Sequence, residues 1–111
     1  MGPLRSARFP AAPESLTVIT AAGVSEAVVL RCAAAIRNEL RRIFAGDDAV
    51  QVIGPAPYAV VRVNNRFRYR VTLLCRRDRR VRQIVSDILC RYNTDKEFKG
   101  VSVFADADPT D

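Results

Sequence analysis

The chain has 111 residues, of which 49% are apolar and 27% charged, proportions typical of a single globular domain. No apolar run approaches the ~18 residues of a membrane span, and the first residues lack the apolar core of a secretory signal, so we expect a cytoplasmic protein with no membrane partner. Histidine is absent, which removes the commonest general base and metal ligand and makes ordinary acid–base enzymes poor candidates.

Positive charge is concentrated in one part of the chain. The formal net charge is +6, but residues 62–91 hold ten arginines against two acidic residues, a local charge of +8. The remaining residues carry slightly more acidic than basic side chains. The excess therefore belongs to one structural unit, and it favours a polyanionic partner.

The first half of the chain predicts a lead-in, a strand and a helix. Residues 1–15 contain three prolines and no periodicity, so we expect an extended segment there. Residues 16–20 are rich in β-branched side chains and favour a short strand. A helix is predicted from Glu26, because Ser25 is a good N-cap and apolar residues follow at steps of three and four. Gly46 stands where a C-terminal cap is expected.

A hairpin is predicted in the middle of the chain. Residues 50–53 form an apolar run that ends at Gly54-Pro55-Ala56-Pro57. Because prolines lack the amide donors of a central strand, we expect a bend or a sheet edge at this point. Residues 58–63 and 67–76 then favour two strands joined by the loop Asn64-Asn65-Arg66.

The alternation of side chains predicts two different faces for this hairpin. A three-residue loop would place Val63 opposite Phe67 and Val61 opposite Tyr69. The apolar face would then contain Val61, Val63, Phe67, Tyr69, Val71 and Leu73. The opposite face would carry Arg62, Arg68, Arg70 and Thr72.

A second helix and a closing strand complete the pattern. Asp78 is a candidate N-cap, and the apolar positions that follow are Val81, Ile84, Val85, Ile88, Leu89 and Tyr92. Residues 93–100 read as a polar loop, and residues 101–105 alternate as a strand. The order predicts an α+β, ferredoxin-like split β-α-β (βαββαβ) fold, an antiparallel sheet with two helices on one face. We assign this domain to residues 16–111.

No catalytic or cofactor motif is recognisable in the sequence. Phosphate-binding glycine loops, dinucleotide fingerprints and calcium loops are absent, so we expect no cofactor. Asp106, Asp108 and Asp111 are able to hold a hard cation, but acids at a chain terminus are usually solvated, and no metal site is assigned. The odd, widely spaced cysteines fit neither disulfides nor zinc, and we expect each to pack as a small apolar residue. They are Cys32, Cys75 and Cys90.

The arginines of the hairpin allow two interpretations. They are Arg62, Arg66, Arg68 and Arg70. A solvated polar face is the first interpretation, because long stems cover apolar surface while the charged heads stay wet. A phosphate-binding surface is the second, because no acidic neighbour balances these charges on the ribbon and arginine suits planar recognition of phosphate. Phe67 and Tyr69 resemble stacking platforms, but their apolar face favours the core for both.

Three segments stand out by their order and spacing. They are Val52-Ile53-Gly54-Pro55-Ala56-Pro57, Val63-Asn64-Asn65-Arg66-Phe67-Arg68-Tyr69-Arg70 and Asp106-Ala107-Asp108-Pro109. Together they resemble the C-terminal domain of the primosomal protein N′ family, the replication-restart DNA helicases, over nearly the whole chain. Two departures are visible. Ala11-Ala12-Pro13 lacks the second proline and the phenylalanine of the family's Tyr-Pro-Pro-Phe segment, and Tyr69 stands where many members have tryptophan.

The resemblance implies a domain that is not itself an enzyme. The family's helicase lobes, ATP-binding loop and zinc module have no counterpart in these residues, so the chain would be either an excised domain or a reduced stand-alone relative. The implied role is to help a helicase recognise branched DNA at stalled forks and dock the tail of single-stranded DNA-binding protein. Implied partners are DNA, branched or single-stranded, that tail protein, and a helicase core or other primosome proteins.

The resemblance also indicates where the tail would bind. The family's tail-binding residues lie near the start of the second helix, which corresponds here to Arg77, Arg79, Arg82 and Gln83. The sequence marks the same end independently, because Arg79, Arg80 and Arg82 fall in a first helical turn whose dipole disfavours cations. We therefore expect this basic helix end to be a second anion site.

The sequence favours a DNA-binding domain in which the hairpin arginines neutralise phosphates and the specificity is for shape. Two alternatives remain open at this stage. One is a docking module that packs on a helicase core with little DNA contact. The other is a small RNA-binding domain of similar fold.

Overall fold

The computed structural model describes residues 14–63, 66–76 and 79–109, except for the side chains at 14–15, 59–63, 76 and 107–109. The elements are β1 (Glu14–Gly23), α1 (Glu26–Ile43), β2 (Gln51–Val63), β3 (Arg66–Arg76), α2 (Arg79–Thr94), a 3-10 turn (Lys96–Phe98) and β4 (Ser102–Pro109). This is the predicted βαββαβ order.

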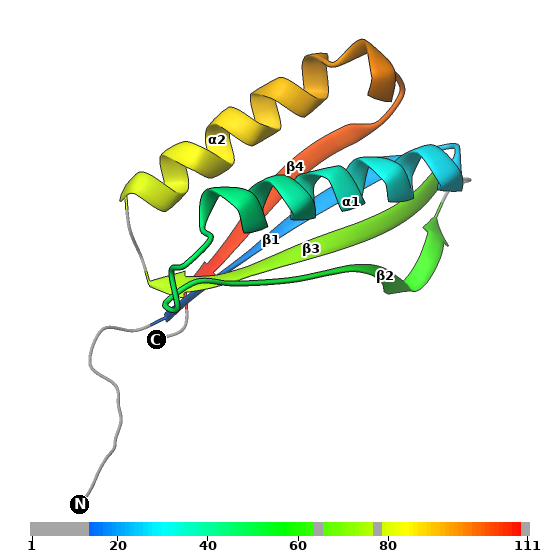
Figure 1. Cartoon of the computed structure of the whole chain (residues 1–111). Helices are drawn as coiled ribbons and strands as arrows, with labels where there is room; N and C mark the ends of the chain where they lie inside the picture. Colours follow the sequence, from blue (N-terminus) through cyan, green and yellow to red (C-terminus); the bar gives the residue numbers. More distant parts are fainter. Residues whose placement is uncertain (1–13, 64–65, 77–78, 110–111) are drawn as a thin grey trace, which may run out of the picture.

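One antiparallel sheet organises the molecule, with the strand order β2-β3-β1-β4. β3 and β1 are the central strands, and β2 and β4 form the edges. Both helices lie on the same side of the sheet and leave its other side uncovered (Figure 1). The ferredoxin-like fold is confirmed. We call the uncovered side the open face.

The core lies between the helices and the sheet. Alternation along β1 and β3 directs Ile19, Ala21, Val71 and Leu73 toward the helices, and each of them is almost completely buried. The helices supply residues at steps of three and four, as an amphipathic helix requires. Besides the polar residue Glu39, the buried helical residues are Val29, Cys32, Ala33, Ile36, Leu40, Val81, Val85, Ile88 and Tyr92.

The buried carboxylate of Glu39 joins the two helices. It is only 8% exposed, and it accepts a hydrogen bond from the Tyr92 hydroxyl at 2.8 Å and another from Arg91. Burial and then the hydrogen bond to Glu39 raise the pKa of Tyr92. A buried charge is tolerated when it is paired and hydrogen-bonded, so this contact holds α1 against α2.

The predicted hairpin register is wrong by one residue next to the turn and by four residues further along β2. Val63 lies opposite Arg66 and Arg62 opposite Phe67, whereas Tyr69 faces Pro57 instead of Val61. The reason is that β2 is irregular, with register shifts between Ile53 and Ala56 and between Pro57 and Arg62. The expectation assumed a regular strand. It remains correct that this proline-containing strand lies at a sheet edge.

Several element boundaries also differ from the expectations. β1 begins at Glu14 and continues through Gly23, because it pairs with β3 along its whole length. α2 extends to Thr94, inside the predicted loop, and β4 continues through the acidic segment to Pro109. Gly46 has a positive φ of 83°, which suits the left-handed turn expected after the helix.

The cysteines confirm their predicted role only in part. Cys32 and Cys75 are buried, as expected for small apolar residues, but Cys90 is exposed on α2. Its position falls outside the buried stripe of the helix, which runs through Val81, Val85, Ile88 and Tyr92. Asp78, the candidate N-cap of α2, lies outside the described residues.

A candidate nucleic-acid interface on the open face

The arginines of β3 share the open face. Val71, Leu73 and Cys75 are buried toward the helices, so the alternate positions Arg68 and Arg70 project to the other side. Cross-strand pairing places Arg68 opposite Ala22 and Arg70 opposite Thr20 of β1. The predicted faces of β3 are therefore confirmed, and its arginines are brought together where no helix covers the sheet.

Tyr58 of β2 organises two of these arginines. The guanidinium carbon of Arg68 lies 4.5 Å from the centroid of the Tyr58 ring, and that of Arg70 lies 5.5 Å from the same centroid. The Tyr58 hydroxyl is hydrogen-bonded to the buried hydroxyl of Thr20. A cation over an aromatic face is attracted by the ring quadrupole. One ring therefore holds two like charges close together.

Arg66 and Arg68 are held in different ways. Arg66 donates from Nη2 to the carbonyl of Ala22 at 3.4 Å and to the hydroxyl of Ser102 at 3.5 Å. The Nε of Arg68 is buried and has no hydrogen-bond partner among the described residues. An anion at Arg68 must therefore be bound by the terminal Nη groups. We call Arg66, Arg68, Arg70 and Tyr58 the basic end of the open face.

Tyr58 was not among the site residues predicted from the sequence. Arg62 lies in β2 opposite Phe67, but its side chain falls outside the described part of the chain. Tyr69 lies on the helix side, where its hydroxyl donates to Glu26 at 2.7 Å, which raises the pKa of Tyr69. The expectation that Tyr69 is no stacking platform for the basic face agrees with this position.

The opposite end of the open face is apolar. Leu16 and Val18 of β1 and Leu74 of β3 are half-buried there, although no helix covers them. Ile53 of β2 lies opposite Thr72 and is 52% exposed. We call Leu16, Val18, Ile53 and Leu74 the apolar end. The open face thus changes from basic to apolar along its strands.

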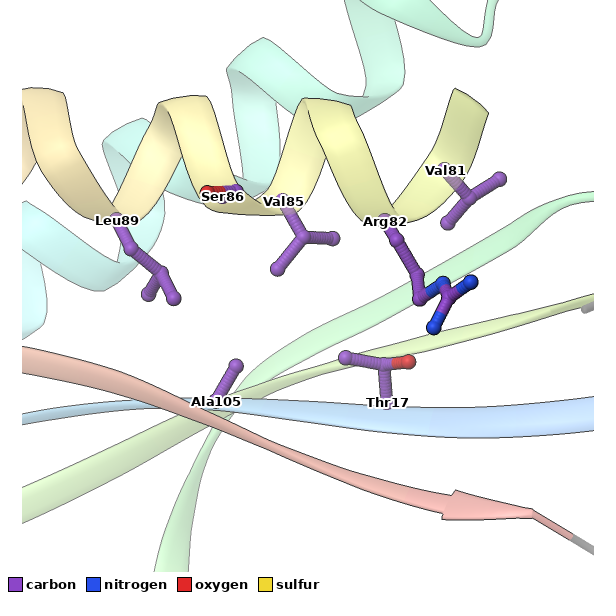
Figure 2. Close-up of a pocket in the computed structure, with 7 residues that line it drawn as sticks. All are labelled: Thr17, Val81, Arg82, Val85, Ser86, Leu89 and Ala105. Atoms are coloured by element: carbon purple, nitrogen blue, oxygen red, sulfur yellow. The ribbon is translucent and has the colours of Figure 1, made fainter. Parts of the chain in front are cut away.

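The predicted second anion site is divided by the structure. Arg82 lines a groove of about 230 Å³ between α2 and the strands β1 and β4 (Figure 2). Arg80 lines a different cavity, of about 100 Å³, beside Phe44 and Asp47. Arg79 is exposed, and Gln83 donates to Asp87 at 3.1 Å. Arg77 lies outside the described residues.

The groove beside α2 combines an apolar lining with one cation. Val85 and Leu89 point from α2 toward Ala105, and the Arg82 side chain extends toward Thr17 (Figure 2). The remaining lining residues are Val81 and Ser86. Such a groove suits a small apolar group that carries a negative charge, because the apolar lining buries the group and Arg82 pairs with its charge.

Within the described ranges, no group of three or more cysteine, histidine or acidic side chains is arranged to hold a metal ion. No helix in those ranges combines the length and the apolar character that crossing a bilayer requires.

Comparison with protein families decides the relationship. The family model described as the primosomal protein N C-terminal domain matches residues 7–110. The chain belongs to this family. Comparison with curated protein sequences gave no match. Membership in the primosomal protein N C-terminal family supports a role in replication restart, carried out by a domain that is not the helicase domain.

Proposed function

We propose that this primosomal protein N C-terminal domain binds DNA without catalysing a reaction, through phosphate contacts at the basic end of the open face. The observation that carries the proposal is the convergence of Arg68 and Arg70 on one tyrosine ring. Two guanidinium groups that lie near the same ring offer several hydrogen-bond donors to phosphate oxygens. The family's role in replication restart supports DNA as the polyanion and the cytoplasm as its place of action.

The geometry favours backbone contacts over base recognition. From Arg66 to Arg70 the strand rises about 13 Å, and a DNA strand carries one phosphate per ~3.4 Å of helix axis, so this row faces several phosphates. Phosphate contacts fix position and orientation but carry no sequence information. We therefore propose recognition of DNA shape, with branched DNA at forks as the preferred ligand.

Charge reversal at one arginine tests the proposal. Arg70→Glu is compared with Arg31→Glu, which makes the same change in net charge at an exposed position of α1, on the helix side of the sheet. We expect Arg70→Glu to weaken binding to forked DNA at least tenfold, since hydrogen bonds to charged groups contribute ~1.5–3 kcal/mol, and Arg31→Glu to weaken it little. Equal losses in the two variants would mean that only net charge matters.

We further propose that the groove beside α2 docks the acidic tail of single-stranded DNA-binding protein. The apolar lining would receive an apolar side chain of the tail, and Arg82 would pair with a carboxylate. The test is binding of a tail peptide to Arg82→Glu, with Arg79→Glu as the matched control, because Arg79 does not line the groove. Selective loss in Arg82→Glu is expected. Loss that is equal in both variants would contradict a groove site.

The apolar end of the open face favours a second candidate function, docking on a helicase core or another primosome protein. Half-buried Leu16, Val18 and Leu74 beside exposed Ile53 form a surface that a protein partner would bury. Ile53→Asp separates the two functions. Normal DNA affinity with lost association with the helicase core supports docking at the apolar end, and unchanged association contradicts it.

A further inference from the structure

Phe104 is an exposed aromatic side chain on the open face. It is 42% exposed, while its neighbour in β4, Val103, is buried on the helix side. Cross-strand pairing places Phe104 opposite Thr20, which in turn lies opposite Arg70. Since neighbouring strands are ~4.8 Å apart, the β4 backbone at Phe104 lies roughly 10 Å from the β3 backbone at Arg70, on the same face.

Packing in the helix-side core does not account for this ring. Phe104 is no part of the core, which lies on the helix side, and a single exposed apolar residue requires no explanation by itself. The position of Phe104 beside the basic end nevertheless suggests a role in binding. Proteins that bind single-stranded nucleic acid combine a positively charged track for the backbone with aromatic side chains on which bases stack. Four-stranded sheets in other proteins present aromatic residues to bases in this way.

We propose that Phe104 is a stacking platform for a nucleobase of a single-stranded nucleic acid whose phosphates contact Arg68 and Arg70. This inference rests on the proposed function and deepens it, because it names a single strand as the ligand of the open face. Asp106 is exposed two residues further along β4. Its carboxylate repels phosphates, so the backbone stays on the arginine side and the base turns toward Phe104.

Thymidine and abasic oligonucleotides of equal length separate stacking from phosphate binding. Both carry the same phosphates, but only the first has bases. We expect Phe104→Leu, which keeps an apolar side chain, to weaken binding of the thymidine oligonucleotide roughly fivefold or more, since stacking contributes ~1–3 kcal/mol per base. The affinity for the abasic oligonucleotide is expected to stay unchanged. A uridine oligonucleotide tells whether DNA or RNA is preferred, and for either one a loss of affinity in Phe104→Leu supports stacking.

A second measurement reports on the ring directly. The chain contains no tryptophan, so Phe104→Trp introduces a single tryptophan at the proposed platform, and its emission is measured with excitation that tyrosine does not absorb. We expect the thymidine oligonucleotide to quench its fluorescence, as base stacking requires. Ile53→Trp is the matched control, because Ile53 is also exposed on the open face but lies at its apolar end. Its fluorescence is expected to change little.

Three results would overturn the inference, and they are distinguishable. If both oligonucleotides bind and Phe104→Leu changes neither affinity, the proposal of phosphate binding stands, but Phe104 is no stacking platform. Phe104 would then be assigned to a contact with a protein. If Phe104→Leu weakens the binding of both oligonucleotides equally, the ring stabilises the fold and does not stack on a base. If the unmodified chain binds neither oligonucleotide, the proposed function fails, and the stacking platform fails with it.

Discussion

At the residue scale, Tyr58 determines how the positive charge of the open face is arranged. Two guanidinium groups repel each other, and the ring near which both lie offsets part of that repulsion. The hydrogen bond between Tyr58 and Thr20 fixes the ring over the central strand β1. Pre-organised cations lose less side-chain entropy when an anion binds. Tyr58 therefore acts on affinity through Arg68 and Arg70.

Removing the aromatic ring is expected to weaken DNA binding. Tyr58→Leu loses two cation–π contacts of ~0.5–1 kcal/mol each, and we predict about a fivefold loss of affinity in fluorescence anisotropy. Tyr58→Phe is the control, because it keeps the ring and removes only the hydroxyl. It should lose less affinity than Tyr58→Leu, because both cation–π contacts remain, although leaving the buried Thr20 hydroxyl without its partner costs about 1 kcal/mol of unfolding free energy. Normal DNA binding by Tyr58→Leu would show that the ring does not position the arginines.

Cys32 predicts a loss of stability at high pH. Burial, and then the negative charge of Asp95, raise the pKa of its thiol from 9.0 to about 11. Because the folded state keeps the proton more tightly, this stabilisation is complete below pH 9 and is lost as the pH rises toward 11. We expect the unfolding free energy to fall by about 2–3 kcal/mol over this range. Urea unfolding of Cys32→Ala should show a flatter pH profile, and an equally steep profile would contradict the assignment.

At the element scale, helix side chains hydrogen-bond to the backbone of both edge strands. Arg37 and Arg41 of α1 donate to the carbonyls of Gly54 and Val52 on β2, at 3.3 and 3.2 Å. At the other edge, the amide of Asn93 exchanges two hydrogen bonds with the backbone of Val103. Uncovered edge strands invite pairing with other chains. These side chains therefore occupy part of each edge, and the open face is the surface that we assign to a ligand.

The edge contacts of α1 lead to a prediction about β2. In Arg37→Ala combined with Arg41→Ala, the two carbonyls lose their donors, and we expect the backbone amides of β2 to exchange faster with solvent. The unfolding free energy should fall by about 1–3 kcal/mol, since each of the two hydrogen bonds contributes ~0.5–1.5 kcal/mol net. Arg31→Ala, at an exposed position of the same helix, is the control. Unchanged exchange in the double variant would mean that the β2–β3 ladder alone holds the edge.

At the scale of the whole molecule, the helices use one side of the sheet for folding and leave the other for binding. Much of this division was predictable from the sequence. The period of two in β3 assigns Arg68 and Arg70 to one face and Val71 and Leu73 to the other, and the structure agrees. The two helices and the element order follow from periodicity and turn residues in the same way.

Other features depend on contacts that periodicity does not contain. The place of Tyr58 follows from register shifts in β2, which add residues on one strand only and so break the alternation on which the prediction relied. The basic end of the second helix was predicted to form one anion site. Residues two apart on a helix do not share a face, however. Arg80 and Arg82 therefore line different cavities.

The most direct test of the account is fluorescence-anisotropy binding of the chain to forked, duplex and single-stranded DNA as a function of salt concentration. If Arg66, Arg68 and Arg70 each neutralise a phosphate, the logarithm of the duplex binding constant should fall with the logarithm of the salt concentration with a slope of about −3 or steeper. We expect forks to bind best. No detectable binding at low salt, or binding without salt dependence, would contradict a phosphate-binding face and assign the open face to a protein interface.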